Sequence, residues 1–453
     1  MLVHGGTFDV ANYGDLLFPL LLRKRLAQAP ISNVSPAGGA AVWTDCVPSV
    51  RFEDLLAKPL QGLIIGGGNI IHTMPSKLRE YEDAGVGLSG YGDLWICSTL
   101  SVDPSVPVIW NAPGVANRFE TAFIDLVRRA LQRTDYLSVR DAASRDCLLE
   151  IDPHLEVAVV PDTAWALPQL WEKAELDARF TSLLNRLGSD AAEPIITIHV
   201  NSRYMNDVPI EEVAATIDHL AATTHAKPLL IAIGPCHGDD IAAKRVAQFT
   251  SSRPLVLDKP ESLEEIVAAI SRSIFYIGSS MHGYITAASF GIPAIAVARG
   301  KLKFDGLTEL TNAPETLISS WADAAPAFAA IDKEVLANKF HDVSKRARKQ
   351  LDDHWTRINR LLATKEVAGH ADPAAFYRAR AELLAAMTNH YRTLNDEDQE
   401  LLRRAEQRLT GAMAKPAKVK APALLSKGVA PVPKGTGALS RLWTRMSKIA
   451  PFS

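Results

Sequence analysis

The sequence has few cysteines, no long apolar run and no excess of charge of either sign. Its cysteines are scattered and form no Cys-x-x-Cys pair, which excludes a disulfide framework and a zinc site of that type; they are Cys46, Cys97, Cys147 and Cys236. A formal net charge of −2 gives the whole chain no attraction for nucleic acid. No stretch reaches the ~20 apolar residues that cross a bilayer. The N-terminus also lacks a secretory-signal pattern. These absences predict a soluble cytoplasmic protein that binds no nucleic acid.

Short apolar runs recur along the first 300 or so residues, each followed by a glycine or polar loop and then by a helical pattern. They lie at 62–68, 106–114, 136–141 and 157–162, and again at 194–200, 228–235, 254–258, 274–280 and 292–298. Strands that alternate with helices predict parallel sheets with helices on both faces. We therefore predict an α/β fold of two Rossmann-like domains, residues 1–168 and 190–330, with a ligand cleft between them.

The pattern changes after residue 330. Apolar residues step by three and four between Leu336 and Leu362 and again after Pro373, which predicts a helical extension over residues 331–410 that packs on the core. Residues 411–453 form a basic tail rich in proline and alanine, without Asp or Glu. Within it, residues 438–452 predict a short amphipathic helix in peripheral contact with anionic lipid on the inner face of the plasma membrane. The alternative is a disordered solubilising tail.

A glycine-rich strand end is the first candidate for ligand binding. The sequence "IIGGGNIIH" places Gly67, Gly68 and Asn69 after a buried strand, where backbone can approach a ligand closely. It matches neither the dinucleotide-binding fingerprint nor the P-loop, so a nucleotide-phosphate site is unsupported. The alternative is an ordinary tight turn.

Charged residues at other predicted strand ends suggest an anion site. Arg140 suits a bidentate grip on carboxylate or phosphate, although it can also simply pair with Asp141. His282 opens a helix whose dipole favours a neutral imidazole able to accept a proton, although a lone histidine is more often structural. Ser279 and Ser280 precede it as small donors.

Further candidates surround these two. Asp162 ends the last strand of the first domain, as a cap, a hinge or a hydroxyl-binding residue. Arg203 is a second candidate for holding an anion. Lys301 and Lys303 follow the last clear strand and either complete a positive pocket or belong to a solvated loop.

Five segments together resemble the polysaccharide pyruvyl transferase family over residues 3–305. They are "NYGD" (12–15), "IIGGG" (64–68), "SVRDAAS" (138–144), "VPDTAWAL" (160–167) and "SSMHGYITAASFGIPAIAV" (279–297), in the family's order. The resemblance implies a GT-B-like arrangement of the two domains. It also implies transfer of a pyruvyl group from phosphoenolpyruvate to a sugar, as a ketal, in a bacterial exopolysaccharide, capsule or cell-wall glycan. Phosphoenolpyruvate is then a co-substrate, and neither a cofactor nor a metal is expected.

The family's site residues carry over one by one. The arginine of its V-R-D motif corresponds to Arg140 and its catalytic histidine to His282. A lysine some twenty residues further on is Lys301 or Lys303, and the spacing leaves both open. Many members have arginine two positions before the histidine, where this chain has Ser280. In this respect the chain resembles the succinoglycan-type exopolysaccharide branch of the family. Because the pocket then has one cation fewer for the phosphate, Arg203 or a lysine has to compensate.

The resemblance implies a donor side in the second domain and an acceptor side in the first. We expect His282 and Arg140 to be catalytic. The predicted donor-binding residues are Arg203, Ser279, Ser280, Lys301 and Lys303. The predicted acceptor-binding residues are Asn12, Asp15, Gly67, Gly68, Asn69 and Asp162, with Asp15 alternatively a helix cap. The acceptor is a saccharide, free or lipid-linked.

Two other functions remain open. A GT-B glycosyltransferase that uses a nucleotide-sugar has the same architecture, but it is expected to carry an acidic residue for the ribose near the donor loop. After "SSMHG" none follows until Asp305. The other alternative is an inactive homologue that serves as a scaffold in polysaccharide assembly.

Overall fold

The N-terminal domain is built on a parallel sheet. The computed structural model describes residues 1–26, 29–190, 192–298, 302–363 and 369–413, with side chains at 302, 303, 305 and 394–413 excepted. Strands β2 (Ile31–Val34), β1 (Leu2–Gly5), β3 (Gly62–Ile65) and β4 (Val108–Trp110) lie in that order. Strands β5 (Leu137–Val139) and β6 (Val157–Val159) continue it through a parallel bridge between Ile109 and Tyr136. This is the doubly wound order in which the chain switches direction between its first and third strands.

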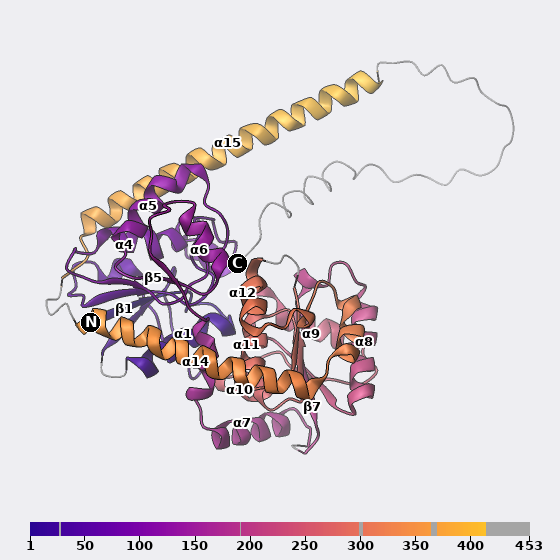
Figure 1. Cartoon of the computed structure of the whole chain (residues 1–453). Helices are drawn as coiled ribbons and strands as arrows, with labels where there is room; N and C mark the ends of the chain where they lie inside the picture. The colour runs from indigo at the N-terminus through magenta and orange to yellow at the C-terminus, as the bar shows by residue number, and fades with distance from the viewer. Residues whose placement is uncertain (27–28, 191, 299–301, 364–368, 414–453) are drawn as a thin grey trace, which may run out of the picture.

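The C-terminal domain is a second parallel sheet, in which six strands follow the order β12-β11-β10-β7-β8-β9. Their bounds are Leu317–Ile318, Ala294–Val297, Phe275–Gly278, Ile195–His199, Lys227–Ile231 and Leu255–Leu257. This is the Rossmann order, with its switch point between β7 and β10. Figure 1 shows the two sheets in separate lobes. The predicted α/β fold of two Rossmann-like domains is confirmed. The sequence did not predict the short edge strands β2 and β12.

Helices cover both sheets. Those of the N-terminal domain are α1 (Tyr13–Arg25), α2 (Arg79–Asp83), α3 (Gly90–Gly92), α4 (Ser98–Ser101), α5 (Ile124–Arg133) and α6 (Ala142–Leu149). Those of the C-terminal part are α7 (Lys173–Arg186), α8 (Ile210–Thr224), α9 (Asp239–Ala247), α10 (Leu263–Ser271), α11 (Met281–Ser289), α12 (Leu302–Thr311) and α13 (Ala324–Ala330). The buried faces of these helices, such as Leu16, Leu17 and Leu21 of α1, supply the apolar surface whose removal from water stabilises each domain.

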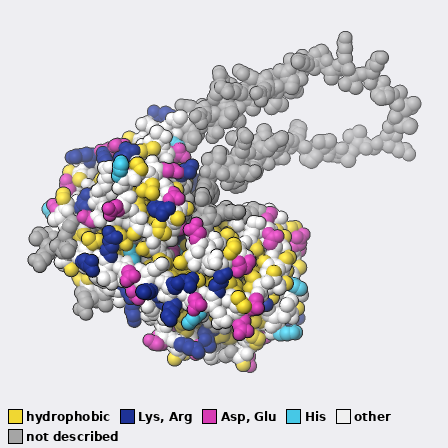
Figure 2. Space-filling model, viewed as in Figure 1, with side chains coloured by type: hydrophobic (Ala, Val, Ile, Leu, Met, Phe, Trp, Pro, Cys, Tyr) yellow, Lys and Arg dark blue, Asp and Glu magenta, His cyan; other side chains and the backbone are white. Residues whose placement is uncertain are grey.

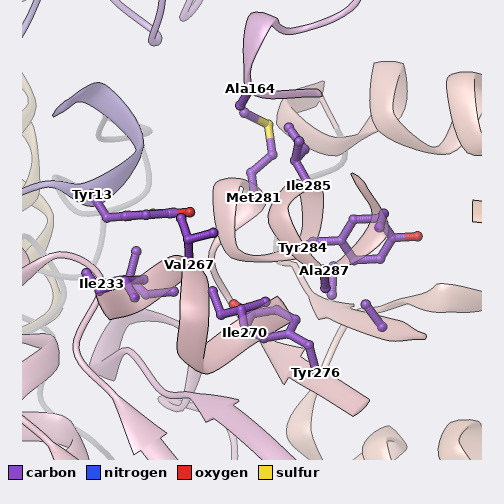
Figure 3. Packing of buried hydrophobic residues seen from close by; sticks show 14 of the residues in the cluster. Tyr13, Ala164, Ile233, Val267, Ile270, Tyr276, Met281, Tyr284, Ile285 and Ala287 are labelled. Carbon is purple, nitrogen blue, oxygen red and sulfur yellow. The ribbon is translucent and has the colours of Figure 1, made fainter. Parts of the chain in front are cut away.

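The hydrophobic core crosses the domain boundary. Tyr13 of α1 belongs to the same buried cluster as Val267 and Ile270 of α10 and Met281 of α11 (Figure 3). The Tyr13 hydroxyl lies 2.7 Å from Oγ1 of Thr286 in α11. The start of α1 is therefore fixed against the C-terminal domain, which determines how the two strand-end edges face each other.

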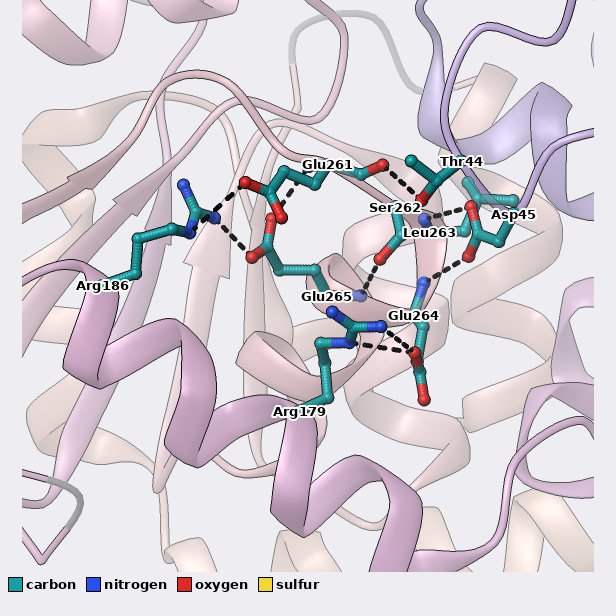
Figure 4. Close-up of polar contacts among 9 residues, drawn as sticks. All are labelled: Thr44, Asp45, Arg179, Arg186, Glu261, Ser262, Leu263, Glu264 and Glu265. Carbon is teal, nitrogen blue, oxygen red and sulfur yellow. Dashed lines mark hydrogen bonds and ion pairs between the residues drawn. The ribbon is translucent and has the colours of Figure 1, made fainter.

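Polar contacts reinforce that boundary (Figure 4). The carboxylate of Asp45, from the N-terminal domain, accepts hydrogen bonds from the backbone N–H groups of Leu263 and Glu264, both at 2.9 Å. It therefore caps the start of α10, where N–H groups lack partners within the helix. Arg179 of α7 contacts Glu264 at 2.9 Å, so α7 packs as part of the C-terminal body.

Residues 331–410 contain most of two long helices that pack on the domains. Helix α14 (Lys333–Ala363) contacts both: Ser344 Oγ donates to the carbonyl of Ser289 at 2.8 Å, and Trp355 Nε1 donates to Asn111 Oδ1 at 3.2 Å. Its apolar face is buried, as its periodicity predicts, and Lys and Arg side chains gather along its outer face (Figure 2).

Helix α15 (Pro373–Met413) begins on the N-terminal domain and then projects away from it (Figure 1). Phe376 stacks on Phe52 with ring centroids 5.7 Å apart, and Arg380 Nε lies 3.2 Å from Asp93 Oδ2. Residues 414–453, including the segment 438–452 predicted to be amphipathic, lie outside the described residues. In the part of the chain that is described, no helix combines the length and hydropathy needed to cross a membrane.

Candidate functional site

A pocket of about 100 Å³ lies between the domains, at the carboxyl ends of the strands. It is lined by residues that follow β1 and β3 on one side and β7 and β10 on the other, and these are the two switch points. Ligands of open α/β sheets bind at such points, because neighbouring loops diverge there and leave a crevice. Eight residues predicted from the sequence line it: Asn12, Asp15, Asn69, Arg140, Arg203, Ser279, Ser280 and His282.

Arg140 and His282 meet on a shared carboxylate. Nη1 of Arg140 and Nε2 of His282 each lie 3.5 Å from Oδ2 of Asp162. The Arg140 side chain is only 4% exposed, whereas that of His282 is 12% exposed. Arg140 comes from the loop after β5 and His282 from the first turn of α11, so the two domains contribute one residue each.

Asp162 lies beneath these two side chains, and it does not line the pocket. Burial alone would raise its pKa, but the adjacent His282 and Arg140 outweigh burial and hold the pKa below its usual value. An ionised Asp162 orients both side chains from behind, which is a positioning role. The sequence left three roles open for Asp162: a cap, a hinge or a hydroxyl-binding residue. The cap is present, because Oδ1 of Asp162 accepts from the N–H of Ala164 at 3.0 Å, and Oδ2 faces Arg140 and His282.

Arg140 also has partners on its own domain. Its Nη2 donates to Oδ1 of Asn69 at 3.2 Å, and its Nε lies 3.5 Å from Oδ2 of Asp141. Asp141 is fixed because it caps α6, accepting from the N–H of Ser144 at 2.7 Å. The predicted pairing of Arg140 with Asp141 therefore exists, but it leaves Nε and Nη1 without a hydrogen-bond partner within the described residues.

Two glycines make room for these side chains. A Cβ on Gly14 would lie 1.9 Å from Nδ1 of His282, and a Cβ on Gly114 would lie 2.7 Å from the Arg140 guanidinium. Only glycine permits such close approach. The "NYGD" segment therefore contributes to the site through Gly14, which the sequence did not single out, as well as through its polar residues.

The wall of the N-terminal domain consists of Asn12, Asp15 and Asn69. Asn12 Nδ2 donates to Asp15 Oδ2 at 2.9 Å. Asp15 is in the first turn of α1 and lies beside Gly68, where a Cβ would be 2.4 Å from Oδ1. Gly67 and Gly68 have φ near +77° and +76°. They do not line the pocket, and they shape the turn that carries Asn69 into it.

The two serines before His282 differ in role. Ser280 Oγ accepts from the N–H of Gly283 at 3.2 Å and caps α11. Ser279 Oγ is buried and has no hydrogen-bond partner in the described part of the chain. Ser279 is therefore the serine available to a ligand.

The remaining predicted cations are less central. Arg203 is exposed at the pocket wall, and its Nη2 lies 3.4 Å from Nδ1 of His237. Lys301 lies outside the described residues. The backbone of Lys303 belongs to α12, but its side chain is not described.

The sequence missed one charged group in the pocket. Asp239, at the start of α9, lies 2.7 Å from Nε2 of His199, the last residue of β7. The segment "GPCHGDD" carried a signal for it, because a carboxylate follows a glycine loop at a strand end there. Among the residues that the structure describes, no cluster of three or more His, Cys, Asp or Glu suits a metal ion.

The fold is distantly similar to several solved structures. UDP-GlcNAc 2-epimerase from Neisseria meningitidis is 13% identical, with a TM-score of 0.40, covering 65% of this chain and 76% of that one. The wall teichoic acid polymerase TagF is 10% identical, with a TM-score of 0.44, covering 80% and 88%. At these identities and TM-scores the likeness says nothing about activity. A comparison with curated protein sequences finds no match.

A family model gives a direct assignment. The model described as polysaccharide pyruvyl transferase matches residues 12–301, well over half of the chain. The match runs from Asn12 through the segments that carry Arg140, Asp162 and His282, which are the residues gathered at the pocket. The chain therefore belongs to the polysaccharide pyruvyl transferase family.

Proposed function

We propose that this protein transfers a pyruvyl group from phosphoenolpyruvate to a sugar of a bacterial exopolysaccharide, capsule or cell-wall glycan and forms a pyruvate ketal. The observation that carries the proposal is the buried guanidinium of Arg140 at the pocket beside His282, whose Nε and Nη1 make no hydrogen bond within the described residues and contact the carboxylates of Asp141 and Asp162 only at 3.5 Å. A buried guanidinium whose hydrogen-bonding capacity is only partly used can still donate to a bidentate anion. Phosphoenolpyruvate brings two anions, a phosphate and a carboxylate.

Several groups suit the donor. Arg140, Ser279 and the first residues of α11 all line the pocket, where an anion gains from the positive charge and from the helix dipole. Arg203 supplies a further positive charge at the wall, and Lys301 or Lys303 remains a candidate from the family pattern. These residues hold the donor and stabilise the phosphate as it leaves.

His282 is the group that moves protons. Ketal formation adds two sugar hydroxyls to C2 of phosphoenolpyruvate, protonates C3 and releases phosphate. A histidine fixed by an ionised carboxylate can take a proton from one atom and deliver it to another. Asp162 holds His282 in that position, and Asn12, Asp15 and Asn69 form the acceptor wall.

A transfer assay tests the donor. Polysaccharide purified from cells that lack this protein serves as acceptor, together with radiolabelled phosphoenolpyruvate. We expect label in the polysaccharide and release of one phosphate for each pyruvyl group. Transfer of label from a nucleotide-sugar instead would overturn the proposal in favour of a glycosyltransferase.

A cell-based variant tests the scaffold alternative. Cells that carry His282→Ala are expected to make polysaccharide without the mass of the ketal-linked pyruvate. Full pyruvylation in those cells would show that another protein performs the chemistry and that this chain is a scaffold.

A further inference from the structure

A second histidine with a carboxylate partner ends the strand next to the one that leads to His282. His199 ends β7, and the strand register pairs it with Gly278 at the end of β10. Nε2 of His199 lies 2.7 Å from Oδ2 of Asp239, and the two side chains are 4% and 3% exposed. Both residues line the same pocket as Arg140 and His282.

The surroundings of Asp239 fix it as an acceptor. Its carboxylate receives the N–H of Gly234 at 2.7 Å and an amide hydrogen from Nδ2 of Asn201. Burial would raise its pKa, but His199 and these donors outweigh burial, so the pKa of Asp239 lies below its usual value. Because an ionised carboxylate only accepts, Nε2 of His199 must carry the hydrogen.

This arrangement leaves Nδ1 of His199 as the ring nitrogen whose lone pair is unused. In a neutral imidazole whose Nε2 is protonated, Nδ1 holds a lone pair. Nδ1 is buried and has no hydrogen-bond partner among the described residues. Gly278 allows His199 to lie this close to β10, because a Cβ there would lie 2.6 Å from Cβ of His199. A carboxylate behind a histidine with a free nitrogen is the arrangement that activates hydroxyl nucleophiles.

We propose that His199 is a second proton-transfer residue, which accepts at Nδ1 the proton of one acceptor hydroxyl, and that Asp239 positions it. The proposal rests on the pyruvyl transfer proposed above. A ketal needs two hydroxyls to react at one carbon, so two protons must be removed. Two histidines that follow the neighbouring strands β7 and β10 line the pocket, and each has a carboxylate partner: His282 with Asp162 and His199 with Asp239.

The steps balance without another reactant. One hydroxyl oxygen bonds to C2 while C3 gains a proton, so the proton lost by that hydroxyl is matched by the one gained by carbon. The C2–O bond to phosphate then breaks, and its electron pair leaves with the phosphate. The second hydroxyl oxygen bonds to C2, and its proton leaves with the phosphate. His282 delivers the proton to C3 and recovers one from the first hydroxyl. His199 takes the proton of the second hydroxyl and passes it to the departing phosphate, so both histidines end as they began.

The test is His199→Gln, in which the glutamine amide still donates to Asp239 but offers no base. We expect kcat for pyruvyl transfer to fall by about 100-fold or more, the usual effect of removing a general base. The KM for phosphoenolpyruvate should stay within about threefold, because the donor groups are untouched. His219→Gln, the same substitution on the exposed face of α8, is the matched control and should leave kcat and KM unchanged.

The outcomes separate this inference from the proposed function. A wild-type protein without pyruvyl transfer would refute the function itself. An active wild type and a His199→Gln variant with kcat within threefold of it would overturn only the role of His199. If His199→Gln does not fold, the variant Asp239→Asn is the test. A fall in kcat with an unchanged unfolding midpoint and an unchanged KM supports the role of His199 and Asp239 in proton transfer. An unchanged kcat overturns that role.

Discussion

At the scale of single residues, the pocket depends on how closely α1 approaches His282. Gly14 has no side chain, and Nδ1 of His282 occupies the space that a Cβ would take. The ring of Phe18, one helical turn further along α1, packs edge-on against the imidazole with centroids 5.5 Å apart. The imidazole is therefore fixed by contact on one side and by Asp162 on the other.

Gly14→Ala tests this packing. We expect transfer activity to fall by about tenfold or more, because a misplacement of roughly 1 Å has large catalytic effects. Alanine would otherwise favour the helix by about 1 kcal/mol. Gly188→Ala, at a turn with open space around it, is the control and should cost stability without affecting activity. An active Gly14→Ala protein would refute the packing argument.

Arg140→Lys tests the bidentate grip. Lysine keeps the charge but lacks the planar fork of N–H groups. We expect the KM for phosphoenolpyruvate to rise by about tenfold or more, measured by steady-state kinetics at saturating acceptor. Kinetics equal to those of the wild type would show that Arg140 acts only as a point charge.

At the scale of the secondary-structure elements, helix ends and long helices determine how the domains meet. Asp45 of the N-terminal domain caps α10 of the C-terminal domain, and α14 contacts both. The cap crosses the boundary that shapes the pocket, and α14 bridges it.

Asp45→Ala removes the cap across this boundary. We expect a loss of about 1 kcal/mol in the free energy of unfolding, the usual effect of losing an N-cap. Denaturant unfolding monitored by circular dichroism measures it. Ser262→Ala removes a cap on the same helix from within the domain, since Ser262 Oγ accepts from the N–H of Glu265. An unchanged midpoint for Asp45→Ala would show that the cap carries no stability.

The basic tail remains a prediction at this scale. If residues 438–452 form an amphipathic helix, the full chain should bind vesicles that contain anionic lipid, and deletion of residues 436–453 should abolish binding. Co-sedimentation with vesicles of neutral lipid provides the control. Equal binding of both proteins would refute membrane contact through the tail.

At the scale of the whole molecule, buried histidines make stability depend on pH. Burial is the main cause that lowers the pKa of His4, His72 and His354 from 6.5 to about 4. Above pH 7 these residues are neutral in both the folded and the unfolded state. As the pH falls from 6.5 towards 4, the unfolded state binds protons that the folded state does not, so stability falls.

By pH 5 each of the three should lower the free energy of unfolding by about 2 kcal/mol. Urea unfolding at pH 7.5 and at pH 5 measures the difference. Replacement of His72 by Gln should reduce the difference in unfolding free energy between the two pH values by the contribution of one histidine, about 2 kcal/mol. Equal stability at both pH values would contradict the burial of these histidines.

The sequence by itself determined the architecture and the approximate place of the site. Apolar strands alternating with helices impose parallel sheets, and parallel sheets bring Asn69, Arg140 and His282 to their carboxyl edges. The edge strand β2 was not predicted because its sequence, "ISNV", is short and half polar.

Only the tertiary structure decided which side chains meet. Asp162 lies under both Arg140 and His282, Gly14 packs on the imidazole, and Asp239 pairs with His199. These partners stand 22 to 268 residues apart in the chain, by subtraction of their numbers. Local propensity acts over a few residues, whereas such distances depend on strand register and on the docking of the two domains. That docking is set by the packing of α1, α10, α11 and α14 around one shared core.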